Sequence, residues 1–146
     1  MKIDRVLPSQ RRVLAAVVDL LLPPSPELEA QTRRRVAEDA TRFVVVEVES
    51  MPKFLRMPYL LAIVAFQWSA MARYARPFSR LASEQRQAYL SLWSHSRVGP
   101  LRDFVKLIRS CALLAYFDHP EVRAVLERGR AAHLAAHEER LRMVAE

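Results

Sequence analysis

The chain has 146 residues, 51% of them hydrophobic and 27% charged, which is the composition of a globular protein with room for one ordinary domain. Lysine and arginine number 23 against 16 acidic residues, and the net charge of +7 suits an acidic protein partner, a membrane surface or nucleic acid. One cysteine excludes an internal disulfide, and two glycines against nine prolines exclude a glycine-rich phosphate loop and favour helices separated by prolines.

The first predicted helix covers residues 9–22, within the stretch PSQRRVLAAVVDLLLPP. Its paired arginines and apolar run also resemble a twin-arginine export signal. Asp19 interrupts the run, however, and Leu-Pro-Pro follows it in place of a small-residue cleavage site. We therefore expect a retained helix with Ser9 as N-cap, packed through Leu14, Val17 and Leu21.

The second predicted helix runs from about residue 27 to 49, and the third from about 58 to 74. The segment FVVVEVE could form a strand, but its flanks are helical and no partner strand is evident. Pro52 and Pro58 are expected to bracket a short connection. The third helix is apolar nearly all round, which predicts a central position in the bundle. No apolar run reaches the length of about 18 residues that a membrane span needs.

Four further helical segments are expected in the second half of the chain. Ser83 is a candidate N-cap for the fourth helix, and Gly99-Pro100 separates it from a fifth over residues 101–117. A short helix to residue 126 follows, Gly129 interrupts it, and residues 130–146 form a polar C-terminal helix. The prediction is an all-α fold, a single compact bundle of six or seven helices within one domain, residues 1–146.

The histidines and the cysteine give only weak evidence of a metal or catalytic site. His133 and His137 lie four residues apart and could share a zinc ion, but a solvated helix face is the simpler interpretation because no third ligand is marked. His95 and His119 are isolated and are interpreted as capping or surface residues. Cys111 lies in an apolar helical context that favours a buried, inert thiol.

Arginines form three clusters along the chain. They lie at residues 11–12, at residues 33–35, and at Arg73, Arg76 and Arg80. With Tyr74 and Trp93 for stacking they could bind nucleic acid, although acidic residues interrupt the remaining sequence. We rank a protein interface above nucleic acid, because arginine suits ion pairs at such interfaces.

A family resemblance becomes apparent over residues 78–126. The pattern begins with FSRLASEQRQAYLSLWS and continues through Arg102, Lys106 and the pair Tyr116-Phe117. The first helix adds the form R…L…D-x-L-L-P at residues 12–23. These segments resemble the gluconate 2-dehydrogenase subunit 3 family and the helical region preceding the FAD domain of long-chain fatty alcohol oxidases. The resemblance covers most of residues 9–126, and a Gly-Tyr pair that often follows in relatives is missing here.

The resemblance implies a non-catalytic accessory subunit that binds and stabilises a larger FAD-dependent alcohol or sugar dehydrogenase or oxidase of the glucose–methanol–choline type. The chain alone would bind no cofactor or metal, and FAD would belong to the partner. Candidate partner contacts are Arg73, Arg76, Phe78, Arg80, Trp93, Arg102, Lys106 and Tyr116, although the spacing of Trp93 also fits the core. We expect a cytoplasmic protein, or a periplasmic one if a partner exports it.

Two other functions remain open at this stage. One is a basic helical module that binds nucleic acid, and the other is a stand-alone helical protein that binds an apolar ligand or itself. The charge favours the first, and the apolar third helix permits the second.

Overall fold

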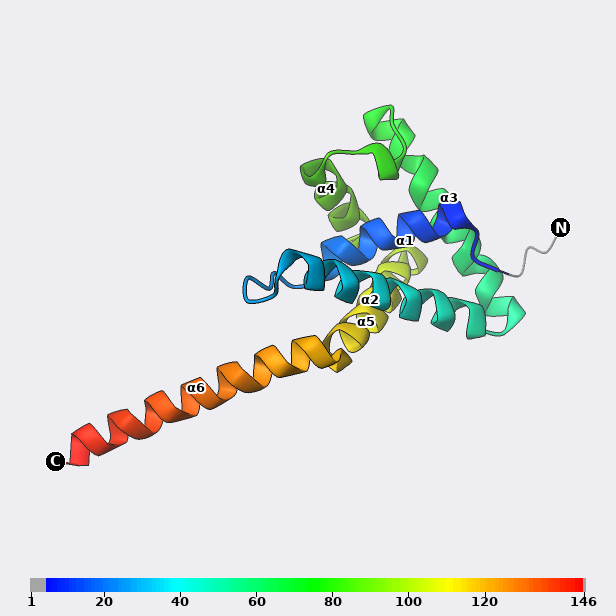
Figure 1. Ribbon diagram of the computed structural model, residues 1–146. Coiled ribbons are helices and arrows are strands. Elements are labelled where there is room, and N and C mark those ends of the chain that lie inside the picture. Colours follow the sequence, from blue (N-terminus) through cyan, green and yellow to red (C-terminus); the bar gives the residue numbers. More distant parts are fainter. Residues whose placement is uncertain (1–4, 146) are drawn as a thin grey trace.

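Helices make up nearly all of the computed structural model, which describes residues 5–145 (Figure 1). Within this range there are six α-helices, one short 3₁₀-helix and no strand. Their bounds are α1 Pro8–Leu21, α2 Ala30–Ser50, α3 Lys53–Tyr74, η1 Phe78–Arg80, α4 Ser83–Ser94, α5 Gly99–Asp118 and α6 Pro120–Ala145. The predicted all-α fold is confirmed, including the helical assignment of FVVVEVE within α2.

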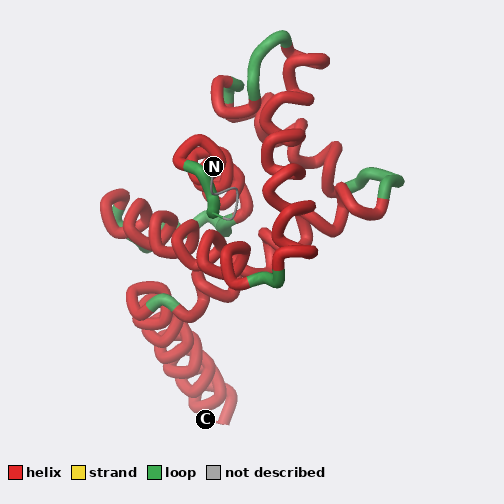
Figure 2. Tube along the Cα trace, turned by 90° about the vertical axis from the view of Figure 1, so that its right-hand side faces the viewer, coloured by secondary structure: helices red, strands yellow, loops and turns green. Residues whose placement is uncertain are grey.

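The helix at the centre of the packing is α1. It contacts α2, α3, α4, α5 and η1, while α2 also packs along α5 and α4 packs against α5. Figures 1 and 2 show α3 at one side of the molecule and α6 projecting from the other. The prediction that the third helix is central is therefore wrong, and its apolar character needs another explanation.

Aromatic rings fill the core around Phe66 of α3. Its ring centroid lies 4.5 Å from that of Phe78, 5.0 Å from Tyr89, 4.9 Å from Trp93 and 6.0 Å from Phe104. Phe66 and Phe78 are fully buried, and the other three rings are at most 7% exposed. This cluster joins α3, η1, α4 and α5, and such tilted and edge-on ring pairs add to the free energy of burial.

Buried polar side chains connect the helices to one another. Gln10 is buried, and its side-chain nitrogen donates to the carbonyl of Leu60 at 3.2 Å. Its oxygen accepts from the backbone N–H of Leu7 at 2.8 Å, which satisfies a donor at the start of α1. Gln10 thus fixes both the beginning of α1 and the position of α3 beside it.

The helix boundaries differ from the predictions at four points. Neither Ser9 nor Ser83 is an N-cap, because glutamine side chains accept from the backbone N–H groups at both helix starts. Pro58 lies in the second turn of α3 rather than before it, and the helix begins at Lys53. Gly129 does not interrupt the chain, since α6 continues unbroken from Pro120 to Ala145. A single glycine costs a helix about 1 kcal/mol, which its neighbours can offset.

His119 joins α6 to the rest of the fold. Its Nδ1 accepts from the backbone N–H of Glu121 at 3.3 Å, which confirms a capping role at the start of α6. Its Nε2 lies 3.1 Å from a carboxylate oxygen of Asp39 on α2. Beyond the first turns, every residue of α6 from Leu126 to Ala145 is exposed, so the helix leaves the bundle as a single rod.

Candidate partner-binding surface

One face of α3 is apolar and uncovered. Leu60, Ile63, Phe66 and Ala70 point into the core, whereas the opposite side of the helix carries large exposed side chains. These recur three, four or seven residues apart and follow the helix from end to end: Phe54 75%, Leu61 64%, Val64 42%, Trp68 59% and Met71 42% exposed. We call these five side chains the α3 stripe. Soluble monomers rarely expose so continuous an apolar surface, and such patches mark interaction sites.

By length and composition alone, α3 could also cross a membrane. Its 22 residues have a mean hydropathy of 1.2 in the most apolar window, and 22% of that window is buried. However, its Gln67 side chain exchanges two hydrogen bonds with Ser79, and its Ser69 hydroxyl pairs with that of Tyr89. These polar side chains bind other parts of the chain, so the helix is built into the bundle.

A groove opens at the C-terminal end of the α3 stripe. It has a volume of about 830 Å³ and lies between the first turns of α1, the last turns of α3 and the segment that leads into η1. Trp68 and Met71 supply its apolar wall, and Arg12, Arg76 and Arg80 supply its charges. Two of the three predicted arginine clusters therefore meet at one site, through Arg12 from the first and Arg76 and Arg80 from the third. Trp68 belongs to both the stripe and the groove.

The backbone at the end of α3 creates this groove. Ala75 adopts a left-handed conformation with φ 56° and ends the helix, and Pro77 leads into η1. The chain then turns back so that Phe78 enters the core, while Arg76 and Arg80 stay exposed on either side of it. Among residues 5–145, no side-chain hydrogen bond or ion pair engages Arg12, Arg76 or Arg80. Their charges are available to a partner.

Three of the eight predicted contact residues are buried in the chain's own core. Phe78 is 0% exposed, Trp93 7% and Tyr116 5%, and the Tyr116 hydroxyl bonds to Ser25. The helical spacing of Trp93 indicated the core, and that interpretation is confirmed. As placed here, these side chains hold the fold together and do not reach a partner.

The other five predicted contact residues are at least partly exposed, but on different faces. Arg73, Arg76 and Arg80 lie near the C-terminal end of α3, and the Arg73 guanidinium lies 5.8 Å from the ring centroid of Tyr74. Arg102 and Lys106 lie on α5, and Nε of Arg102 is buried without a hydrogen-bond partner among the residues described. Of these five residues, only Arg76 and Arg80 line the groove, so the structure divides the predicted set.

The spacing rules also missed the residues of the α3 stripe. An apolar helix was interpreted as a buried one, because sequence does not show which apolar face finds a partner within the chain. The signal was nevertheless present, since Phe54, Leu61 and Trp68 recur every seven residues.

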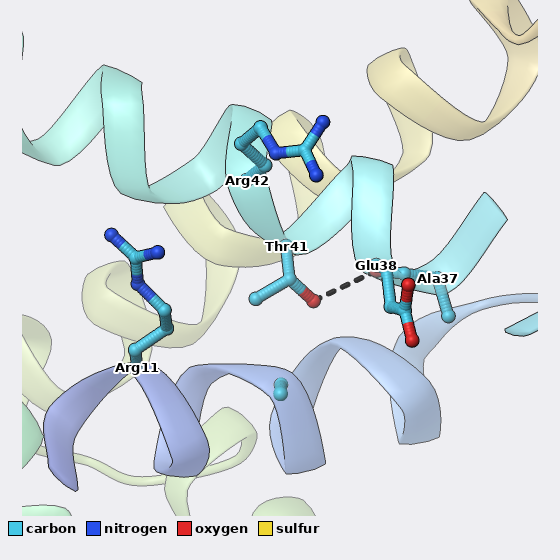
Figure 3. Close-up of a pocket in the computed structure, with 6 residues that line it drawn as sticks. Arg11, Ala37, Glu38, Thr41 and Arg42 are labelled. Carbon is cyan, nitrogen blue, oxygen red and sulfur yellow. Dashed lines mark hydrogen bonds between the residues drawn. The ribbon is translucent and has the colours of Figure 1, made fainter. Parts of the chain in front are cut away.

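Several of the other arginines take part in local contacts or line small clefts. Arg33 donates to the carbonyl of Pro23 at 2.8 Å and so ties α2 to the proline-rich turn. A smaller cleft, of about 300 Å³, lies between α1 and α2. Figure 3 shows Arg11 and Arg42 toward one end of it and Glu38 toward the other. The Thr41 hydroxyl donates to the carbonyl of Ala37 at 2.8 Å, so it is already satisfied. With charges of both signs, this cleft has no clear preference for an acidic ligand.

No metal centre emerges from the titratable side chains. Within residues 5–145, no group of three or more histidine, cysteine, aspartate or glutamate side chains is placed to hold a metal ion. Burial, assisted by the negative charge of Glu47, raises the pKa of the half-buried Cys111 thiol. Burial, and then the charges of Asp103 and Cys111, likewise raise the pKa of Tyr59. These shifts keep both groups protonated and less reactive.

The fold and this surface define a helical interaction protein, whose most distinctive feature is an uncovered apolar helix face next to an arginine-lined groove. The chain belongs to the gluconate 2-dehydrogenase subunit 3 family, whose model matches residues 8–127. This match confirms the resemblance to that family, while the link to fatty alcohol oxidases stays a prediction. Comparison with curated proteins and with solved structures gives no match. The family is that of an accessory subunit of a dehydrogenase complex.

Proposed function

We propose that the chain is a non-catalytic subunit that binds and stabilises a larger FAD-dependent dehydrogenase or oxidase of the glucose–methanol–choline type, which acts on an alcohol or a sugar. In this proposal FAD and the reacting groups belong to the partner. Membership of the gluconate 2-dehydrogenase subunit 3 family supports a subunit role. The identity of the partner follows from the resemblance described for residues 9–126.

The observation that carries the proposal is the uncovered face of α3. Five large apolar side chains, each between 42% and 75% exposed, lie along one helix. Each square ångström of apolar surface left in water forfeits about 25 cal/mol of burial free energy. A partner that covers the stripe recovers this free energy, and the isolated chain is correspondingly prone to aggregate. A subunit that is stable only in its complex would show this pattern.

In this proposal the partner determines the cellular compartment in which the chain acts. The chain itself would be cytoplasmic, and a partner with an export signal would carry it to the periplasm. The subunit would act by covering part of the partner's surface, which stabilises the folded partner by mass action.

Co-expression of the tagged chain with the genes that flank its own tests the proposal. An affinity tag on the chain should retain a second, larger polypeptide whose absorbance at visible wavelengths reports bound FAD. The flavoprotein expressed alone should be less soluble or should unfold at a lower temperature. If the tagged chain retains no flavoprotein at low salt, the proposed function is wrong.

A further inference from the structure

We infer that the face formed by α1, α3 and η1 is the docking surface for the dehydrogenase subunit, and that the partner's complementary surface is apolar at its centre and acidic at its edge. This inference rests on the proposed function and deepens it. It names which side of the chain is covered and the chemistry that covers it.

The first argument is that the segments that form this face carry the excess positive charge of the chain. Residues 5–18 and 51–83, which supply most of α1 and all of α3 and η1, contain eight basic residues and no acidic residue. The rest of the chain then holds 15 basic residues against 16 acidic ones and is nearly neutral. Arg11 lies in the cleft between α1 and α2, and the Arg56 guanidinium donates to the carbonyl of Glu49. Arg12, Arg76 and Arg80 line the groove, and a partner surface of opposite sign complements these three charges.

The second argument is the arrangement of apolar and charged groups. Trp68 and Met71 belong to both the α3 stripe and the groove, so the stripe that begins at Phe54 ends in the wall of the groove. Arg76 and Arg80 stand at the groove's edge, where an acidic side chain of the partner could pair with them. The groove has Trp68 and Met71 in its wall and arginines at its edge, and no carboxylate lines it. This is the composition of a protein interface.

The shape of the surface favours a protein over a bilayer or a nucleic acid. The groove of about 830 Å³ has a concave form that a protruding side chain or loop can fill and a flat bilayer surface cannot. Nucleic acid would use the arginines and could stack on Trp68, but it would leave Phe54, Leu61 and Val64 in water.

Matched variants test the docking surface. Leu61→Ala on the α3 stripe is compared with Leu114→Ala on α5, because these leucines are 64% and 63% exposed and differ only in the face they occupy. For charge, the double variant Arg76→Glu/Arg80→Glu is compared with Arg35→Glu/Arg109→Glu, which removes the same charge from exposed positions outside the face. Circular dichroism confirms that each variant is folded.

The affinity of each variant for the purified flavoprotein subunit is measured at two salt concentrations. We expect Leu61→Ala to weaken binding about 10-fold or more and Leu114→Ala to change it less than about 2-fold. Arg76→Glu/Arg80→Glu should weaken binding at least about 10-fold and reduce its salt dependence, whereas the control pair should have a much smaller effect.

The outcomes separate the two proposals. If the unmodified chain does not bind the flavoprotein, the proposed function fails. If it binds but the Leu61 and arginine variants bind as tightly as their controls, the docking surface is wrong and the proposed function stands. The unmodified chain is also tested for binding to anionic phosphatidylglycerol vesicles and to a DNA duplex. If the Leu61 and arginine variants lose that binding but still bind the flavoprotein, this face belongs to a membrane or a nucleic acid and the inference is overturned.

Discussion

The two tryptophans of the chain provide a test of the structure, because they occupy opposite environments. Trp68 is 59% exposed on α3, whereas Trp93 is 7% exposed within the aromatic core. Substitution of each by alanine should therefore affect different properties. Trp93→Ala should lower the free energy of unfolding, and Trp68→Ala should leave the fold nearly intact and weaken partner binding.

The expected difference can be estimated from burial. The Trp93 ring lies 4.9 Å from Phe66 and 5.7 Å from Phe104, measured between centroids. A buried aromatic ring covers roughly 200 Å² at about 25 cal/mol per Å², and its removal leaves a cavity, so Trp93→Ala should cost about 3–5 kcal/mol. Trp68→Ala loses only the smaller covered part of the ring and gains about 0.5 kcal/mol of helix propensity. A net cost of about 1 kcal/mol is expected.

Urea denaturation followed by circular dichroism at 222 nm measures both costs without relying on tryptophan fluorescence. With a slope of about 1–3 kcal/mol per M, a difference of about 3 kcal/mol separates the two midpoints by at least about 1 M. Single-tryptophan variants, Trp68→Phe and Trp93→Phe, provide a second measurement. Acrylamide should quench Trp68 much more strongly than Trp93.

Equal unfolding midpoints for the two alanine variants would refute this reasoning. So would a larger loss of stability for Trp68→Ala, since that result would place Trp68 in the core. Loss of flavoprotein binding by a well-folded Trp93 variant, with binding by Trp68→Ala unchanged, would return Trp93 to the interface.

Three further predictions concern other parts of the chain. Gly129→Ala should raise the helix content and stability of α6 by about 0.5–1 kcal/mol, seen as slower amide exchange around residue 129, because an added Cβ meets no atom within 4 Å. Cys111 should react with iodoacetamide at pH 8 more slowly than a free thiol, because burial raises its pKa, and Glu47→Gln should speed the reaction. Because the pKa of Cys111 is raised in the folded state, its thiol adds a stabilising contribution that is fully present below the unfolded-state pKa. The free energy of unfolding should fall as pH rises from there through the folded-state pKa, and Cys111→Ala should abolish this pH dependence.

Several features of the fold could be predicted from local chemistry. Prolines located most of the connections between helices. Helical spacing agrees with the core of α2, where Val36, Ala40, Val44 and Val48 are buried. Helix starts were less predictable, because a glutamine three residues inside the helix replaced the expected serine caps. Leu114 is apolar and lies within α5, yet it is 63% exposed because the core side of this helix consists of Phe104, Val105, Ile108, Ala112 and Tyr116.

The binding surface was harder to predict, for a physical reason. An apolar residue at helical spacing is equally suited to the core and to an interface, and only the packing of α1 against α3 decides between them. The prediction therefore treated Phe78, Trp93 and Tyr116 as candidate contacts and the stripe on α3 as core. The arginine clusters were a better guide to the binding surface, since Arg76 and Arg80 lie at the groove.

Photo-crosslinking tests the central claim, that the uncovered face of α3 is where a dehydrogenase subunit binds. A photo-reactive benzoylphenylalanine is placed at position 61 or, as the control, at position 114, two sites of nearly equal exposure in the unbound chain. Irradiation of the co-expressed complex should crosslink position 61 to the FAD-containing subunit and leave position 114 free. Crosslinking from position 114 with none from position 61 would contradict the account.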